Sequence, residues 1–250
     1  MSTLALKLIA CVAMLCDHIG YFGVLPPAVS LGMRIVGRIA FPIYCYLLSF
    51  GFRKTHNKYL YLARLAAFAV ISELPFNYCF YGTVSFGFKN VFFTLSLGLA
   101  AVLIYDIMAQ GRGLASKLLA IVPTVLFALI ADWLETDYAG FGVALIFLFY
   151  MAGESKLYAS VVCVLFGARY VLDGLISAIV DGFAHPYISD WDWIAMFAAA
   201  SAIPILLCNG SRGAYPRSRV GKLLYKYAFY AYYPVHMLLL GLIMHRGFGV

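Results

Sequence analysis

The sequence predicts an all-α fold, a polytopic bundle of membrane helices, and three observations lead to this class. Of the 250 residues, 64% are apolar and only 12% carry a charge, against about 25% in a typical soluble domain. Aromatic residues reach 17%, as expected for a chain with many membrane interfaces. The apolar residues form runs of about 20, the length of a membrane helix. This composition excludes a disordered chain, a nucleic-acid-binding domain and a soluble enzyme with one core.

Short linkers separate the apolar runs, and no internal repeat is visible, so we expect a single domain over residues 1–250. We find nine runs, which predict about nine transmembrane helices: Leu4–Phe22, Leu31–Phe52, Tyr59–Phe80, Asn90–Met108, Leu114–Trp133, Tyr138–Met151, Leu157–Val180, Trp191–Cys208 and Tyr225–Met244. The sixth run is short, and is interpreted as either an interfacial or a buried partial span. The first lacks a small-residue cleavage site and is interpreted as a helix rather than a signal peptide.

The charge distribution predicts the orientation in the membrane. The formal net charge is +7, and the basic side chains concentrate in alternate loops, of which 53–58 and 212–226 are the richest. An intervening loop, 132–137, carries acidic residues instead. The positive-inside rule places the basic loops, and with them the N-terminus, in the cytoplasm.

Ionisable side chains inside the apolar runs are the strongest functional signal, because they are costly in a bilayer and usually functional there. At a rise of ~1.5 Å per residue, five helices are expected to bring polar groups to one layer in the outer half of the membrane. These groups are Asp17, His18, Arg34, Arg38, Glu73, Asn77, Arg169, Asp173 and His236. The three arginines and three carboxylates nearly neutralise each other, which leaves the histidines as proton carriers.

Spacing within the helices leaves alternatives open. Arg34 and Arg38 are four residues apart, so both leave one face of a helix. Arg34 alternatively extends to the outer membrane surface. Arg169 and Asp173 have the same spacing, so they either join the layer or only pair with each other.

The remaining members of the layer also have structural alternatives. Glu73 either takes part in the chemistry or only pairs with an arginine, and His236 is either functional or a hydrogen-bonded core residue. Neighbouring residues on a helix do not face each other, so Asp17 is expected to bind an arginine such as Arg38 rather than to orient His18.

The cysteines give no sign of a metal site or of a disulfide framework. No Cys-x-x-Cys spacing occurs, and all six lie within or at the ends of apolar runs. We expect them to be packing residues, and we expect no bound metal.

Several motifs together resemble the TraX family of conjugal transfer proteins. They are Asp17-His18-Ile19-Gly20, Arg34-Ile35-Val36-Gly37-Arg38-Ile39-Ala40-Phe41-Pro42, Gly51-Phe52-Arg53-Lys54-Thr55, Tyr59–Leu65, Asn90–Leu95 and Phe229–His236. The resemblance covers nearly the whole chain, and several motifs in the right order are far more specific than any one alone.

The resemblance implies an integral-membrane acetyltransferase. Founding members of the family acetylate the N-terminal amine of conjugative pilin. The family is grouped with transmembrane acyltransferases, including heparan acetyltransferase and bacterial cell-surface sugar acylators. These take acyl groups from cytosolic acyl-CoA and deliver them to acceptors across the membrane. In that set a histidine at the first core helix is catalytic and nearby arginines assist, and His18, Arg34 and Arg38 match those positions. The resemblance also implies a bacterial inner membrane location.

The physical chemistry of the residues agrees with this reading. Acetyl-CoA is the expected co-substrate, and cationic loops attract its phosphates or anionic lipid head groups. The cations expected to bind acetyl-CoA are Arg53, Lys54, Lys58, Arg212, Arg217, Arg219 and Lys222.

His18 is expected to act either as a general base or as a covalent acyl carrier. Arg38 or Asn77 is expected to stabilise the developing oxyanion. Small residues such as Gly98 and Gly167 are expected to leave room for the pantetheine arm.

Other functions remain open at this point. The acceptor is a peptide amine, an amino sugar or a lipid head group, and membrane lipids but no nucleic acid are expected as partners. A proton-coupled secondary transporter would use the same intramembrane polar layer, although no repeat typical of transporters is visible. A non-catalytic scaffold would use the layer only to hold helices together.

Overall fold

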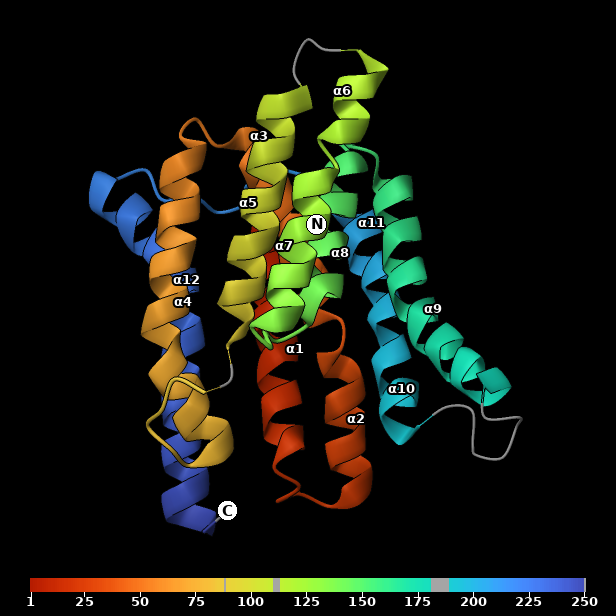
Figure 1. The fold of residues 1–250 in the computed structure, drawn as a ribbon. Coiled ribbons are helices and arrows are strands. Elements are labelled where there is room, and N and C mark those ends of the chain that lie inside the picture. The colour runs from red at the N-terminus through yellow and green to blue at the C-terminus, as the bar shows by residue number, and fades with distance from the viewer. Residues whose placement is uncertain (88, 110–112, 181–188, 250) are drawn as a thin grey trace. The chain divides into compact units, whose positions relative to one another are not determined.

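A computed structural model describes residues 1–87, 89–109, 113–180 and 189–249, and in that part every named secondary-structure element is a helix (Figure 1). Seven helical segments are long and apolar enough to cross a membrane: Thr3–Tyr21, Pro27–Lys54, Lys58–Tyr81, Val91–Ala109, Leu114–Trp133, Lys156–Val180 and Arg219–Phe248. Two shorter apolar segments, Ala139–Met151 and Trp191–Leu207, match the two remaining predicted runs. The all-α polytopic membrane fold is therefore confirmed.

The chain forms two compact units, and each is described by itself. The first consists of Met1–Leu47 and Ala152–Ala214. Its elements are α1 (Thr3–Tyr21), α2 (Pro27–Gly37), the first half of α3 (Ala40–Lys54), α9 (Lys156–Val180), α10 (Asp190–Ala195), the 3₁₀ helix η1 (Met196–Ser201) and α11 (Ala202–Leu207). The organisation of the whole chain as one domain stays a prediction.

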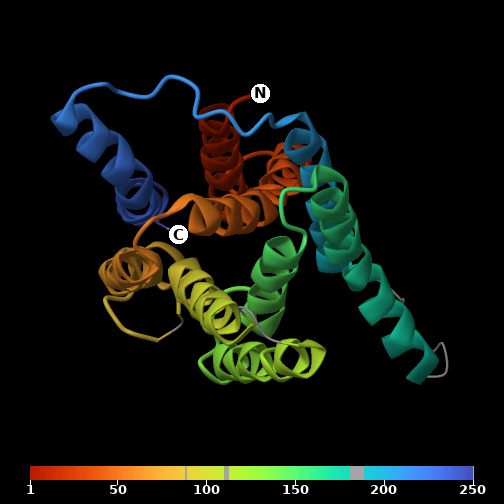
Figure 2. The ribbon, with the colours of Figure 1, turned by 90° about the horizontal axis from the view of Figure 1, so that it is seen from above.

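In the first unit, α1 and α2 form an antiparallel hairpin (Figure 1), and α9 packs against η1, α10 and α11 (Figure 2). Ser2 caps the start of α1, because its side chain accepts a hydrogen bond from the backbone of Ala5. The N-terminal residues are also tied to the segment after α11. The backbone N–H of Thr3 donates to the carbonyl of Ser211 over 2.7 Å, and that of Asn209 donates to the carbonyl of Met1 over 2.8 Å.

The predicted run Leu31–Phe52 is not one continuous helix, because α2 ends at Gly37 and α3 begins at Ala40. Pro42 explains the break. Proline has no N–H to donate to the carbonyl four residues earlier, and its ring clashes there. The interruption falls at Arg38, which caps the end of α2.

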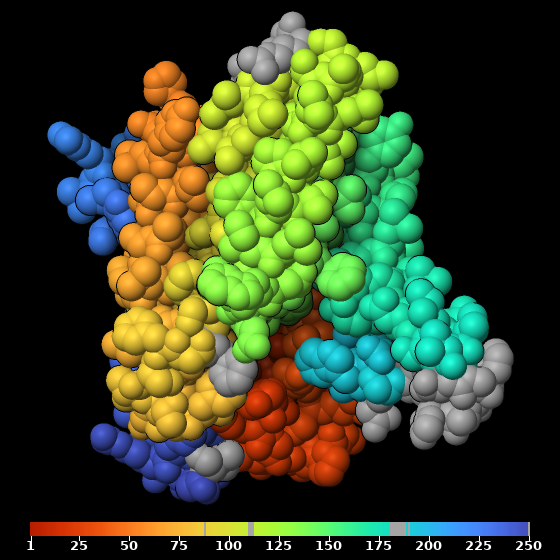
Figure 3. Space-filling model, in the orientation of Figure 1, coloured from red at the N-terminus to blue at the C-terminus, as the bar shows by residue number. Residues whose placement is uncertain are grey.

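The second unit consists of Leu48–Met151 and Tyr215–Val250. Besides the end of α3 it contains α4 (Lys58–Tyr81), α5 (Val91–Ala109), α6 (Leu114–Leu119), α7 (Val122–Trp133), α8 (Ala139–Met151), α12 (Arg219–Ile243) and the π-helix η2 (Met244–Phe248). Here α5 packs against α4, α7 and α8, and α4 packs against α12. Part of α7 is visible in Figure 3. Its exposed side chains include Leu126 and Leu129, as expected for a surface that meets lipid.

Candidate active site

Two glycines allow α1 and α2 to approach closely near the turn of the hairpin. A Cβ atom on Gly37 would lie 2.2 Å from Cβ of Asp17, and one on Gly20 would lie 2.8 Å from the carbonyl oxygen of Ser30. No side chain fits at either distance. Both glycines belong to the sequence motifs, and the close approach brings Asp17 against α2.

The Asp17 carboxylate pairs with both arginines of α2. Arg34 Nη1 donates to Oδ1 over 3.0 Å, and Arg38 Nη2 donates to Oδ2. The side chains of Asp17, Arg34 and Arg38 are 12%, 14% and 6% exposed. The structure therefore agrees with the expected Asp17–Arg38 pair. It also shows Arg34 as an ion-pair partner rather than as a side chain that extends to the outer surface.

An aromatic side chain covers the two guanidinium groups. Cζ of Arg34 and Cζ of Arg38 each lie 4.8 Å from the ring centroid of Trp191, at the start of α10. Cζ of Arg34 lies 5.4 Å from the ring centroid of Tyr21 as well. Cations are attracted to the faces of such rings. The cluster of Asp17, Arg34, Arg38 and Trp191 is called the arginine cluster below.

His18 lies in the last turn of α1, directly after Asp17, and is half-buried. Successive helical side chains point in different directions, so the carboxylate that binds the two arginines is not placed to orient this imidazole. Arg169 and Asp173 pair with each other on α9, with Nε 3.4 Å from Oδ2 and a carboxylate side chain that is 51% exposed. The intrahelical alternative describes this pair.

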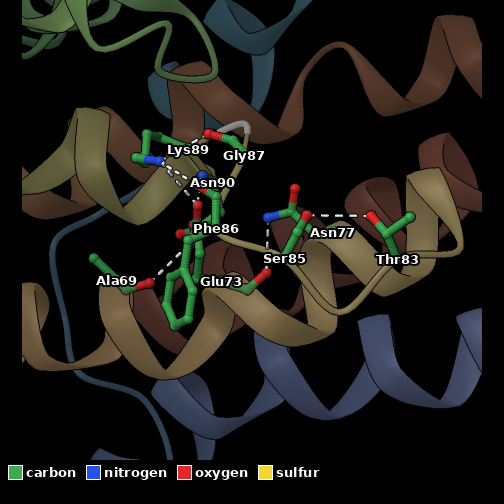
Figure 4. A network of polar contacts seen from close by, with 9 residues as sticks. All are labelled: Ala69, Glu73, Asn77, Thr83, Ser85, Phe86, Gly87, Lys89 and Asn90. Carbon is green, nitrogen blue, oxygen red and sulfur yellow. Dashed lines mark hydrogen bonds and ion pairs between the residues drawn. The ribbon is translucent and has the colours of Figure 1, made fainter.

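In the second unit, Glu73 is fully buried and lies in the polar network of Figure 4. Asn90 donates to Glu73 Oε2 twice, from Nδ2 over 2.6 Å and from the backbone over 3.3 Å. Lys89 Nζ lies 3.6 Å from Oε1 and also donates to the carbonyls of Phe86 and Gly87. Glu73, Lys89 and Asn90 are called the Glu73 network below. The carboxylate thus pairs with a lysine, not with the arginine that the alternative reading proposed.

Asn77 is held by the same helix as Glu73. Its Nδ2 donates to the carbonyl of Glu73 over 3.0 Å, four residues earlier (Figure 4). The amide that the sequence offered as an oxyanion donor is therefore engaged with backbone in this structure.

His236 is buried in α12 and is held by its own helix. Nδ1 donates to the carbonyl of Tyr232 over 2.7 Å, and the ring stacks on that of Tyr232 at 4.7 Å.

Two contacts set the register of α4 against α12, Phe68 with Tyr230 and Cys79 with Gly241. Glu73 and His236 both lie between these contacts, so they occupy similar heights on parallel helices. Whether they share a layer with the arginine cluster stays a prediction.

Two of the cations predicted to bind acetyl-CoA, Arg53 and Lys58, have partners within the second unit. Lys58 Nζ donates to Asp106 over 2.6 Å, and the hydroxyl of Tyr150 donates to the same carboxylate over 2.6 Å. Arg53 Nη1 donates to the carbonyls of Phe149 and Tyr150, near the end of α8. An open depression of about 390 Å³ lies here, lined by Arg53, Tyr105, Asp106, Ala109, Lys117, Tyr150 and Met151.

The other predicted cations are exposed. Lys54 lies 5.6 Å from the ring centroid of Phe50. The remaining four are Arg212 in the first unit and Arg217, Arg219 and Lys222 in the second. The last three surround the start of α12, where the side chain of Ser218 accepts a hydrogen bond from the backbone of Gly221.

Two expectations about space inside the helices are wrong. A Cβ atom on Gly98 would lie 2.4 Å from Ile146 Cδ1, and one on Gly167 would lie 2.5 Å from the carbonyl oxygen of Met196. Both glycines serve close packing between helices, so neither leaves room for a pantetheine arm.

The described residues contain no group of three or more His, Cys, Asp or Glu side chains placed to hold a metal ion. All six cysteines carry free thiols, and five of them are buried.

The sequence matches the TraX protein family over residues 2–244. The chain belongs to the TraX family. It is also similar to the probable fimbrial assembly protein FimC, serogroup H1, of Dichelobacter nodosus, with 28% identity over 251 residues that cover 96% of this chain and 94% of that protein. No solved structure matches the chain. The family membership inferred from the motifs is thereby confirmed.

Three side chains at the clusters of this TraX protein were not singled out from the sequence: Trp191, Lys89 and Asn90. Trp191 begins an apolar run, where tryptophan is common for interfacial reasons alone. Asn90 begins a run as well, and its side chain accepts a hydrogen bond from the backbone of Phe92. The family motif Asn90–Leu95 and the place of a polar residue at the edge of a membrane helix both pointed to Asn90, but neither pointed to its contact with Glu73.

Proposed function

We propose that the chain is a membrane-embedded acetyltransferase. It moves an acetyl group from cytosolic acetyl-CoA to an amine or hydroxyl acceptor at or beyond the outer half of the membrane. The observation that carries the proposal is the arginine cluster, with His18 as the next residue of α1 after Asp17. Two guanidinium groups are fixed on one buried carboxylate, inside helices that otherwise present mostly apolar residues. Such groups within membrane helices are functional by default, and membership in the TraX family supports this chemistry.

In the proposed reaction, the acceptor nitrogen or oxygen attacks the thioester carbonyl. The new bond to the carbonyl carbon forms, the carbon–sulfur bond breaks, and free CoA leaves as its thiol. His18 removes the proton of the attacking group and passes it to the departing sulfur. In the second route, a ring nitrogen of His18 attacks the thioester carbonyl, and the carbon–sulfur bond breaks to release CoA as its thiolate. The acceptor then attacks the acetyl group on His18, the bond to the ring nitrogen breaks, and the acceptor's proton goes to the thiolate. Either route ends with acetylated acceptor and CoA.

The arginines are proposed to stabilise the negative charge that develops on the carbonyl oxygen. A fixed donor at that position is typically worth about 3–4 kcal/mol of the barrier. Asp17 would act through Arg34 and Arg38, because its carboxylate sets where their guanidinium groups point. Arg38 is the preferred donor, since its side chain is the more buried of the two.

The acceptor we propose is a peptide amine of the pilin type or a cell-surface molecule. The name of the similar Dichelobacter nodosus protein refers to fimbrial assembly, and fimbriae consist of pilin subunits. Because the donor is cytosolic, the proposed location is the bacterial inner membrane. The exposed cations Arg217, Arg219 and Lys222 are proposed to attract the phosphates of the donor. Neutralising all three together should weaken CoA binding and leave the arginine cluster intact.

The test uses the purified chain in lipid nanodiscs with acetyl-CoA labelled in the acetyl group. We expect label transfer to a peptide amine, or slow hydrolysis, and its loss in His18→Ala. His56→Ala is the matched control, because His56 is exposed in the loop before α4. Both variants must keep the unfolding temperature of the parent protein. Full turnover in His18→Ala would overturn the role of this residue.

A proton-coupled transporter is the second candidate, and the buried Glu73 favours it. A carboxylate with no exposed surface in a membrane helix is typical of proton pathways. A transporter would move solute into liposomes with no CoA present, and CoA at millimolar concentration would not raise its unfolding temperature. An acetyltransferase gives the opposite result in both measurements.

A further inference from the structure

Arg64 is a charged residue inside a membrane helix that the proposed reaction does not use. It lies six residues after Lys58, the first residue of α4, which at ~1.5 Å per residue is roughly 9 Å along the helix. The surrounding turn is apolar apart from Tyr61. A guanidinium group at such a depth requires a partner or an aqueous opening.

The partners of Arg64 supply hydrogen bonding but no negative charge. Its side chain hydrogen-bonds to that of Tyr230 on α12, and its Cζ lies 5.8 Å from the ring centroid of Tyr61. Among the described residues, no carboxylate lies within ion-pair distance of Arg64. Its Nε is buried and has no hydrogen-bond partner in the same part of the chain. Arg34 and Arg38, by contrast, share the carboxylate of Asp17.

The two tyrosines beside Arg64 are held in place by their neighbours. The ring of Tyr230 stacks on Phe68 at 5.1 Å and lies nearly parallel to Phe92 at 6.4 Å. A Cβ atom on Gly51 would lie 3.0 Å from Oη of Tyr61, so this hydroxyl rests against the backbone of α3. The hydroxyl of Tyr230 accepts from the guanidinium group and keeps its own proton to donate. The site is therefore rigid before any ligand arrives.

We propose that Arg64, Tyr61 and Tyr230 form a binding site for a phosphate group. The planar guanidinium fork matches phosphate oxygens in a bidentate way, and a half-buried cation without a carboxylate partner gains most from a doubly charged anion. Arg53, near the end of α3, adds positive charge close to the start of α4. Two sources carry this chemistry, a phosphate of the acyl-CoA donor and the head group of an anionic phospholipid. The first rests on the proposed function and the second does not.

The experiment compares ligand binding by the full chain and by Arg64→Gln in nanodiscs of neutral phosphatidylcholine. The probes are CoA, adenosine 3′,5′-bisphosphate and pantetheine, which carries no phosphate. If the donor supplies the phosphate, Arg64→Gln raises the Kd of CoA and of the bisphosphate at least tenfold and leaves that of pantetheine unchanged. Tyr230→Phe gives a smaller rise. Arg246→Gln is the matched control and changes none of them, because Arg246 is exposed and lies in η2, beyond the opposite end of α12.

The second arm adds phosphatidylglycerol to the nanodiscs and counts the lipids retained by native mass spectrometry. If a lipid supplies the phosphate, the parent chain retains phosphatidylglycerol and Arg64→Gln does not, while CoA binding is the same in both. If the parent chain binds no CoA at all, the proposed function fails but the lipid arm still decides the phosphate site. Arg64→Lys, which keeps the charge without the fork, tests the site if the Gln variant does not fold. Parent-like CoA and lipid binding in Arg64→Gln and in Tyr230→Phe would overturn the proposal.

Discussion

The arginine cluster and the Glu73 network both place a buried carboxylate in a membrane helix, but they neutralise it differently. Asp17 meets two guanidinium groups from α2, and the ring of Trp191 covers both. Glu73 meets one ammonium group and one amide, from the adjacent residues Lys89 and Asn90 just before α5.

This difference indicates what each carboxylate does. Asp17 is paired with two guanidinium groups, so the arginine cluster brings two positive charges to one carboxylate. Glu73 has one positive charge and is held by hydrogen bonds from a neighbouring loop, so its environment is close to neutral. The first arrangement is suited to stabilising developing negative charge, and the second is suited to fixing Lys89 and Asn90, just before α5, against α4.

The largest expected effect comes from Asp17→Asn. Removing the carboxylate takes away the ion-pair partner that Arg34 and Arg38 share, and breaking a buried ion pair in this way typically costs about 3–5 kcal/mol. We expect a large fall in the unfolding temperature in detergent and loss of acetyl-CoA turnover. Asp173→Asn is the control, because its pair with Arg169 is exposed and worth at most about 0.5 kcal/mol. Equal losses in the two variants would contradict the buried-pair account.

Gly37→Ala separates helix packing from charge at the same place. The added methyl group would meet Cβ of Asp17 at 2.2 Å and its Cα at 2.7 Å, so the backbone of α1 must shift. Overpacking of this kind typically costs about 1–3 kcal/mol. Gly32→Ala on the same helix is the control, because nothing lies within 4 Å of its Cβ position. Gly32→Ala is expected to stabilise α2 by about 0.5–1 kcal/mol. If Gly32→Ala also lowered the stability, the loss in Gly37→Ala could not be assigned to the close contact with Asp17.

Glu73→Gln probes the second carboxylate. Glutamine keeps an oxygen for Asn90 but loses the charge that faces Lys89, so the cost should be smaller than that of Asp17→Asn. A double-mutant cycle with Lys89→Met measures the pair directly. We expect a coupling energy of about 1 kcal/mol, since contacting residues usually couple by about 0.5–3 kcal/mol. Lys156→Met replaces Lys89→Met in the control cycle and should give additive effects. Additivity in both cycles would mean that Glu73 and Lys89 do not interact.

Much of this fold follows from the sequence, because the apolar runs report the membrane helices directly. The break between α2 and α3 was missed, since Pro42 acts on a carbonyl four residues earlier and the run stays apolar across it. The partner of Asp17 was predictable, because a helix turns its successive residues to different sides. The sequence predicts that Lys58 binds acetyl-CoA, whereas the structure pairs it with Asp106. Asp106 lies 48 residues further along the chain, and sequence spacing does not reveal such a pair.

Trp191 was missed for the same reason, and it gives the smallest but most specific prediction. Its ring lies over both guanidinium groups, and each cation–π contact at a partly exposed site is worth about 0.5–1 kcal/mol. Trp191→Leu should therefore cost about 1 kcal/mol, whereas Trp191→Phe should cost less because it keeps a ring. Trp193→Leu is the matched control, since Trp193 lies on the same short helix with a similar exposure of 52% against 46%. If Trp191 holds the arginines in position, the Leu variant lowers acetyl-CoA turnover more than it lowers the unfolding temperature, and Trp193→Leu changes neither.

The fluorescence of a chain that keeps only Trp191 should shift in Asp17→Asn, because the two guanidinium groups beside the ring lose the carboxylate that holds them in place. An unshifted spectrum would show that the ring and the ion pair are independent of each other.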